Sequence, residues 1–269
     1  MGGLKLLFFS MLMAWFLCAH KVHSSSGDMP VRIAVAANFK PTLQNLAKAY
    51  LAQNPQANVQ ISSASSGVLY AQVLRGAPFD LFLSADSERP EMLQQQGLVE
   101  TDSLISYALG QLVLWAPGLT ELNSDKVKAF SGNIALANPK LAPFGRASIQ
   151  TLEKLGLWDS ERNKLIMANN VSQVAQMVSI GAVPMGLLSK SLIKTADKKN
   201  VWQVPDTYYQ AIVQQMVILN TLEVSEQHRQ RVRSFYHYIL SPQGKNIISQ
   251  NGYLLPSVSS TVENFADGR

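Results

Sequence analysis

Residues 31–38 read VRIAVAAN, an apolar run that ends on a small polar residue directly before an amphipathic pattern. The same arrangement returns at 59–67, where VQISSASSG again precedes a helical pattern. Each stretch predicts a β-strand, a short polar loop and a helix start. Because the first turn of a helix exposes free backbone N–H groups and the positive end of the helix dipole, each loop suits an anion. Two such loops early in one chain predict a protein that holds an oxyanion without using charged side chains.

Short apolar runs alternate with helical patterns along most of the chain, which indicates an α/β protein with mostly parallel sheets. The predicted strands lie at 31–37, 58–62, 80–84, 111–116, 133–137, 164–168, 183–188, 201–204 and 211–219. Two smaller sheets fit a chain of 269 residues better than one large sheet. The longest extended runs, 111–117 and 210–218, are candidates for strands that cross between two hinged lobes.

The N-terminal segment predicts a secretory signal peptide, residues 1–26. Lys5 supplies the positive charge, residues 6–18 are almost purely apolar, and a serine-rich stretch follows. The apolar run is too short for a transmembrane helix, although an uncleaved anchor stays open. Lipidation at Cys18 is disfavoured because Trp15-Phe16-Leu17 supplies no small residue before it. No later segment is long and apolar enough to span a bilayer.

The charge and cysteine counts exclude several classes of function. The full chain carries a formal charge of +5, and without residues 1–26 it has 21 basic and 18 acidic residues, or +3. This mild excess contains no basic run, so nucleic-acid binding is not indicated. Removal of the signal peptide also removes Cys18, the one cysteine. The exported chain would then have no disulfide, thiolate nucleophile or cysteine metal site, which suits the periplasm.

Four predicted strand-to-helix loops are the candidates for ligand binding, because ligands in α/β sheets lie at the carboxyl ends of strands. They lie at 37–39, 65–67, 142–145 and 169–171. Asn and Ser are also ordinary N-cap residues, so simple capping stays open as the alternative for each loop. No loop carries a pair of carboxylates, and Asp86 beside one of them would serve equally as a helix cap. The loops therefore offer mainly donors, which favours a fully deprotonated dianion over hydrogen phosphate.

Catalysis finds little support in the sequence. His228 and His237 are the histidines that remain after residues 1–26, and both fall in a C-terminal helical segment. The chain has no Gly-x-Ser-x-Gly elbow, no His-Glu-x-x-His and no P-loop. Ser65 and Ser66 lack a candidate base in their sequence context, which argues against a serine nucleophile.

Several segments occur together in a fixed order: AANF (36–39), ASSG (64–67), GAPFDLFLSAD (76–86), PFGRA (143–147), LGLW (155–158) and NV (170–171). This order resembles the periplasmic molybdate-binding proteins of ATP-driven molybdate importers, over roughly residues 30–265. The stretch at 76–86 is the most specific of these segments, whereas the serine-rich loop alone would be a weak signal.

The resemblance implies the two-lobed, type II-like fold of periplasmic binding proteins, with a ligand cleft and two crossing segments. The implied division is a signal peptide at 1–26, a first lobe from 27–110 and 206–269, and a second lobe from 111–205. It further implies a binding protein, not an enzyme, that takes molybdate or tungstate without any cofactor. Its implied partner is the permease of an ABC importer in the inner membrane, and we expect it to act as a monomer that binds no nucleic acid.

The resemblance also assigns ligand contacts by position. Asn38 matches the first-loop ligand, which is asparagine in one branch of the family, and Ser66 would give a hydroxyl and a backbone N–H. Phe144 and Val171 match backbone donors, and Ala37 is expected to add another N–H. Molybdenum would be held only as its oxyanion, through Asn38, Ser66 and Val171.

One position departs from the family pattern. Ser189 stands where many members carry a tyrosine, and its shorter hydroxyl puts selectivity among molybdate, tungstate and sulfate in question. Lys40, Arg75 and Arg146 lie near the loops and are interpreted as rim charges that steer anions.

Three other functions remain as alternatives. One is a binder of another ligand, such as sulfate, thiosulfate or a small organic acid. Another is a secreted hydrolase that uses Ser65 or Ser66. The third is the ligand-sensing domain of a transcription regulator, against which the signal peptide and the lack of a DNA-binding region argue.

Overall fold

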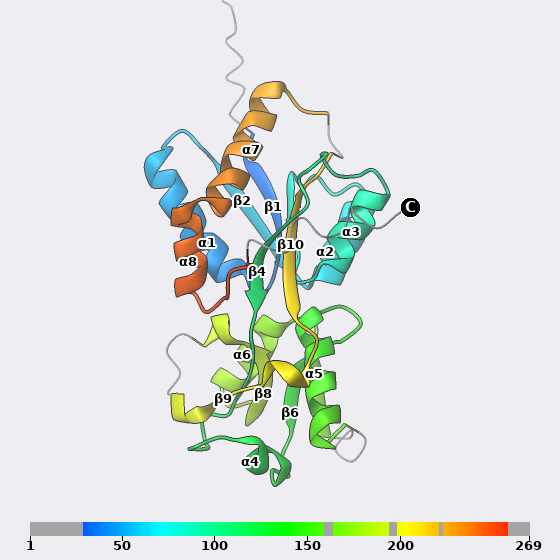
Figure 1. The fold of residues 1–269 in the computed structure, drawn as a ribbon, viewed down its shortest axis with the longest axis vertical. Coiled ribbons are helices and arrows are strands. Elements are labelled where there is room, and N and C mark those ends of the chain that lie inside the picture. Colours follow the sequence, from blue (N-terminus) through cyan, green and yellow to red (C-terminus); the bar gives the residue numbers. More distant parts are fainter. Residues whose placement is uncertain (1–28, 159–163, 194–197, 221–222, 258–269) are drawn as a thin grey trace, which may run out of the picture.

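The computed structural model describes residues 29–158, 164–193, 198–220 and 223–257. The predicted signal peptide, with Lys5 and Cys18, lies outside these ranges. The described chain forms two five-stranded sheets, one in each of two lobes arranged along the long axis (Figure 1). The predicted two-lobed α/β fold is confirmed. Each sheet is mixed, however, and not mostly parallel as the sequence predicted, because the strands that follow each crossing run antiparallel to their neighbours.

The first sheet has the order β2-β1-β3-β10-β4. Its strands are β1 (Val31–Ala36), β2 (Val59–Ala64), β3 (Leu81–Leu83), β4 (Ile105–Gly110) and β10 (Ile212–Ile218). Its helices are α1 (Lys40–Gln53), α2 (Ser66–Leu74), α3 (Glu88–Gln95), α7 (Glu226–Leu240) and α8 (Pro242–Gln250). Strand β1 is parallel to β2 with Ala36 opposite Ala64, so the loops after these strands lie side by side.

The second sheet has the order β7-β6-β8-β5-β9. Its strands are β5 (Leu112–Trp115), β6 (Ile134–Ala137), β7 (Leu165–Ala168), β8 (Met185–Ser189) and β9 (Val201–Gln203). Helices α4 (Ser124–Lys128), α5 (Pro143–Leu155) and α6 (Val171–Ser179) accompany it, with short 3₁₀ helices η2 (Lys190–Leu192), η3 (Lys198–Asn200) and η4 (Asp206–Tyr208). Strand β6 is parallel to β7, with Ala137 opposite Ala168, so the loops leading into α5 and α6 are also neighbours.

Each lobe has its own apolar core. In the first lobe, Leu43 and Leu46 of α1 are fully buried against Phe235 and Ile239 of α7. In the second, Leu152 of α5 and Val174 of α6 pack with the buried strand residues of that sheet. These positions recur at helical spacing, and each fully buried side chain of this size contributes about 1.5–3 kcal/mol. The cores hold the strand ends, and therefore the loops, in place.

The chain passes between the lobes at two points. Strand β4 ends at Gly110 and β5 begins at Leu112, so the first crossing falls at Gln111. The return falls between β9 and β10, after η4. The predicted strand at 111–116 corresponds to β5 in the second sheet, and the one at 211–219 corresponds to β10 in the first. The sequence did not predict β4. A Cβ at Gly110 would lie 2.8 Å from Phe144 Cζ and 2.9 Å from Gln214 Nε2, so a larger residue just before the first crossing would displace these side chains.

Candidate anion-binding site

A small pocket lies where four helix-leading loops from both lobes meet. It is lined by Ala36, Ala37, Asn38, Ser65, Ser66, Ala85, Ala142, Pro143, Phe144, Asn170 and Val171. The structure thus brings together all the predicted contacts except Ser189. None of the lining residues is a carboxylate, a lysine, an arginine or a histidine.

The four helices that begin at this pocket share a composition that suits an anion. The first turns of α1, α2, α5 and α6 contain no acidic residue. Of the four helices that begin elsewhere, α3, α4 and α7 each carry an acidic residue in the first turn, and α8 does not. An acidic side chain would stabilise a helix start but would repel a bound anion. The chain therefore leaves the positive ends of these four helices uncompensated.

Backbone donors are available at the pocket. Within the described part of the chain, the N–H groups of Asn38, Ser66, Phe144 and Val171 donate to no protein acceptor. Three of them lie in the first turn of a helix, where a backbone N–H has no partner within the helix. The Ser66 Oγ accepts a 2.9 Å hydrogen bond from the Ala85 N–H, so the proton of this hydroxyl is left to donate. The site can therefore offer four N–H donors and one O–H donor.

The side-chain amide of Asn38 is bonded within the protein. Asn38 is buried, and its Nδ2 donates to the Oε1 of Gln214 and to the Oη of Tyr253, each at 3.0 Å. These two bonds use both amide protons. Asn38 thus presents its backbone N–H to the pocket, while its side chain fixes the loop to β10 and to the C-terminal segment.

Ala37 lines the pocket, but its N–H is already used. It donates to the Ala64 carbonyl at 2.9 Å and so extends the β1–β2 ladder by one bond. The Ala37 carbonyl accepts from the Ser172 Oγ at 2.9 Å, a contact from the opposite lobe. The predicted role of Ala37 as an N–H donor to the ligand is therefore wrong, and the residue contributes only to the wall.

Ser189 lies behind the pocket wall. Its buried Oγ is hydrogen-bonded to the Ser191 Oγ at 2.8 Å, and Ser191 donates in turn to the Asn38 carbonyl at 3.1 Å. The Tyr253 hydroxyl lies 2.8 Å from the same carbonyl. Burial raises the pKa of Tyr253 far above its ordinary value, so this phenol stays neutral. Ser189 therefore supports the Asn38 loop and does not line the pocket.

Tyr253, Ser191 and Gln214 were not found by sequence reasoning. No local pattern marks them, because each is a single polar residue whose partner lies more than 60 positions away. Only the packing of the C-terminal segment against the first loop brings them together.

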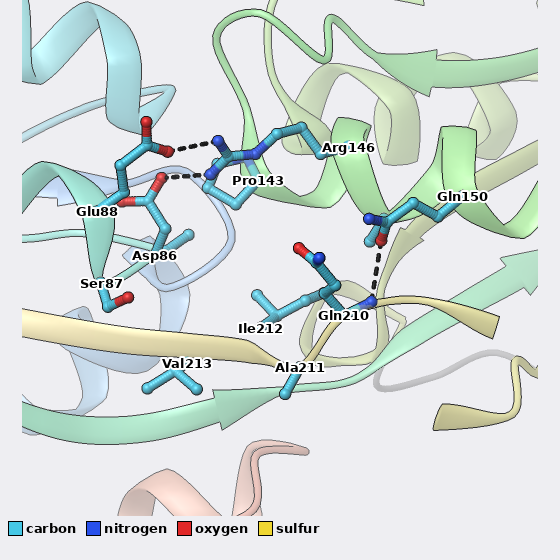
Figure 2. Close-up of a pocket in the computed structure, with 12 residues that line it drawn as sticks. Asp86, Ser87, Glu88, Pro143, Arg146, Gln150, Gln210, Ala211, Ile212 and Val213 are labelled. Atoms are coloured by element: carbon cyan, nitrogen blue, oxygen red, sulfur yellow. Dashed lines mark hydrogen bonds and ion pairs between the residues drawn. The ribbon is translucent and has the colours of Figure 1, made fainter. Parts of the chain in front are cut away.

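Asp86, Glu88, Arg89 and Arg146 lie on the rim of the cleft and neutralise one another. Figure 2 shows the first two with Arg146. Arg146 of α5 contacts Asp86 Oδ2 at 3.0 Å and Glu88, both in the first lobe. Asp86 also pairs with Arg89 and accepts a hydrogen bond from the Ser84 Oγ. The hydrogen bond from Arg146 lowers the pKa of Glu88. Arg146 thus lies at the rim as predicted, but its charge is paired with acids of the first lobe, whereas Lys40 and Arg75 are exposed.

The lobes touch across the cleft through further bonds. The Gly67 N–H of α2 donates to the Leu141 carbonyl at 2.9 Å, and Ser172 reaches Ala37 as described above. Between Arg146 and η4, the Gln150 side chain accepts from the Gln210 N–H at 2.9 Å (Figure 2). Because these bonds join elements of both lobes around the pocket, the structure has its cleft closed.

The described residues give no support to a metal site or to a serine nucleophile. They contain no group of three or more His, Cys, Asp or Glu side chains that could hold a metal ion. His228 lies outside the pocket, fully buried, with its Nε2 2.9 Å from Asp80 Oδ1. No histidine therefore lies beside Ser65 or Ser66 to act as a base. In the same described ranges, no helix is long and apolar enough to cross a membrane.

Two α/β lobes joined by two crossings, with a neutral donor-lined pocket closed between them, define a solute-binding protein. The chain belongs to the bacterial extracellular solute-binding protein family, whose model matches residues 31–254. Its relatives are transport proteins and not enzymes.

The relatives indicate a more specific group within the family. A molybdate-binding protein ModA from Rhodobacter capsulatus is 30% identical over 223 residues, which cover 82% of this chain and 86% of that one. A molybdate-binding protein ModA from Azotobacter vinelandii is 33% identical over 230 residues, covering 83% and 89%. The solved structure of an Azotobacter vinelandii periplasmic molybdate-binding protein superposes with a TM-score of 0.78 at 37% identity, and covers 84% of this chain and 100% of that one. The resemblance inferred from the sequence is confirmed.

Proposed function

We propose that this protein captures molybdate in the periplasm and delivers it to the permease of an ABC importer in the inner membrane, with tungstate as a second ligand. The observation that carries the proposal is a small pocket between the lobes where four unpaired backbone N–H groups and the Ser66 hydroxyl meet without any carboxylate. The names of its relatives support molybdate as the cargo.

The donor set supports a deprotonated dianion. A hydrogen bond to a charged group contributes about 1.5–3 kcal/mol, so several of them offset the cost of desolvating the anion. A protonated anion such as hydrogen phosphate would bring an O–H that needs an acceptor. The Ser66 Oγ already accepts from Ala85, and no carboxylate lines the pocket.

The proposed contacts follow the geometry. We assign the backbone N–H groups of Asn38, Ser66, Phe144 and Val171 and the Ser66 hydroxyl to the anion. We further propose that the lobes divide at 27–110, 111–205 and 206–269, that residues 1–26 direct export, and that the protein works as a monomer. Support for the division comes from the crossing at Gln111 and the return that precedes β10.

An anion panel tests the cargo. Native mass spectrometry of the purified exported protein with molybdate, tungstate, sulfate and phosphate is expected to give one-to-one complexes with the first two. Equal retention of all four anions would contradict the proposal. Retention of sulfate alone would replace molybdate with sulfate as the cargo.

Ser66→Ala is expected to weaken molybdate binding by at least about 1 kcal/mol, because it removes the hydroxyl donor and the acceptor of the Ala85 N–H. Isothermal titration calorimetry measures the loss. The control is Ser225→Ala, which removes the cap of α7 and should lower thermal stability without changing affinity. An unchanged affinity for Ser66→Ala would remove this residue from the site.

Gly67→Ala is expected to hinder closure of the cleft. A Cβ at this position would lie 3.1 Å from the Leu141 carbonyl oxygen and 3.1 Å from Arg89 Nη2, so the opposite lobe would have to move. Crowding of this kind costs about 1 kcal/mol or more, which predicts a roughly fivefold loss of molybdate affinity. Isothermal titration calorimetry measures this loss. Gly118→Ala, whose Cβ would meet nothing within 4 Å, is the control. Wild-type affinity of the Gly67 variant would argue against this contact.

A further inference from the structure

Ser65 is a buried serine whose hydroxyl has no hydrogen-bond partner among the described residues. It is 4% exposed and lines the pocket beside Ser66. Its Oγ is buried and forms no hydrogen bond with any described residue. An unsatisfied buried hydroxyl is costly, because the group loses its water without gaining a partner.

The position of Ser65 makes this lack of a partner more unusual. Ser65 is the N-cap residue of α2, where a serine hydroxyl ordinarily accepts from a backbone N–H of the first turn. The N-caps Asn123, Asn170, Ser225 and Ser241 all do so in this structure. Ser65 does not, although its backbone is extended as capping requires, with φ −67° and ψ 151°.

The reason lies in the opposite lobe. The first-turn N–H of Gly67, which is a normal target for the cap, donates instead to the Leu141 carbonyl across the cleft. The contact between the lobes therefore takes one local partner of the Ser65 hydroxyl, at the position where the pocket forms. A molecule in the pocket can satisfy this hydroxyl instead.

The geometry points to Ser65 as a further anion contact, whose hydroxyl donates to an oxygen of the bound oxyanion alongside Ser66. This inference rests on the proposed function and adds a residue to its site. An oxygen of the anion would accept the hydrogen bond that the Ser65 hydroxyl does not make to the protein. An anion too small to reach both hydroxyls leaves Ser65 unsatisfied, so the residue favours a large tetrahedral oxyanion over a small one.

The test compares Ser65→Ala with Ser103→Ala. Ser103 is also 4% exposed, but its Oγ donates to the Glu100 carbonyl and accepts from the Ile218 N–H, away from the pocket. In the ligand-free protein, Ser65→Ala is expected to melt at or above the wild-type temperature, because a methyl group replaces an unsatisfied hydroxyl. Ser103→Ala should melt lower, because it breaks two bonds.

Calorimetric titration with molybdate gives the second readout. Ser65→Ala should bind about tenfold more weakly than wild type or worse, as expected for loss of a hydrogen bond to a charged ligand, and Ser103→Ala should bind like wild type. Wild-type affinity in Ser65→Ala would overturn the inference. So would a fall in its ligand-free melting temperature as large as that of Ser103→Ala, which would indicate a structural hydroxyl. If the wild-type protein binds neither molybdate nor tungstate, the proposed function itself fails, and that result is separate from either outcome for Ser65.

Discussion

Val171→Pro is expected to weaken molybdate binding roughly 10- to 100-fold while leaving the fold intact. Val171 is the first residue of α6, and its N–H is one of the four unpaired donors at the pocket. Proline is favoured at the first position of a helix, where it removes an N–H that has no partner within the helix. The substitution therefore deletes one backbone donor without breaking α6.

The local backbone accepts this proline. Asn170, the preceding residue, is extended with φ −154° and ψ 168°, and a residue before proline favours an extended conformation. The Asn170 side chain caps α6 through the N–H groups of Ser172 and Gln173, which the substitution does not touch. The expected loss corresponds to one hydrogen bond to a charged ligand, about 1.5–3 kcal/mol.

Ser124→Pro is the matched control. Ser124 begins α4, and its N-cap Asn123 is likewise extended, with φ −148° and ψ 178°, and caps through its side chain. Helix α4 lies at the far end of the second lobe, away from the pocket (Figure 1). Calorimetry should show wild-type affinity for the control and a large loss for Val171→Pro, with similar circular dichroism for both. Equal affinities would mean that the Val171 N–H does not contact the anion.

Gly145→Ala is expected to lower stability by about 2 kcal/mol or more and to abolish tight binding. A Cβ at this position would lie 2.3 Å from the Ala137 carbonyl oxygen and 2.9 Å from the Asn138 carbonyl carbon. Both are backbone atoms at the end of β6, and they cannot rotate away as the end of a flexible side chain can. Helix α5 must therefore move away from the sheet. That movement would carry the Phe144 N–H out of the pocket.

Thermal unfolding and molybdate titration check this prediction together. A loss of 2 kcal/mol lowers the melting temperature of a protein of this size by roughly 4–8 °C. Gly118→Ala serves again as the control, since its Cβ would enter open space. A Gly145 variant that melts and binds like the control would show that α5 can move away from the sheet at little cost. It would also show that the close approach of α5 to β6 does not position the Phe144 N–H.

The local features of the site could be predicted from the sequence. The strand, loop and helix starts around Asn38, Ser66, Phe144 and Val171 depend on residues a few positions apart, and all four reach the pocket. Asn170 acts as a cap, as its residue type indicates. Strand β4 was missed because its apolar residues run on towards β5, and only Gln111 separates the two strands.

The sequence could not predict which donors are free. The amide of Asn38 is taken by Gln214 and Tyr253, the N–H of Ala37 by Ala64, and the charge of Arg146 by acids of the other lobe. Each of these partners is distant in sequence, so no local pattern reveals them.

The sequence by itself determined the fold class, the four helix starts and the absence of carboxylates from the loops that lead into these helices. These features follow from local propensity and residue type, which act over a few residues. The tertiary structure alone decided which groups at those starts remain available to an anion, because that depends on the contacts made when the two lobes close. The unpaired hydroxyl of Ser65 is the clearest case, since it lies at a capping position while one of the N–H groups from which it could accept is bonded across the cleft.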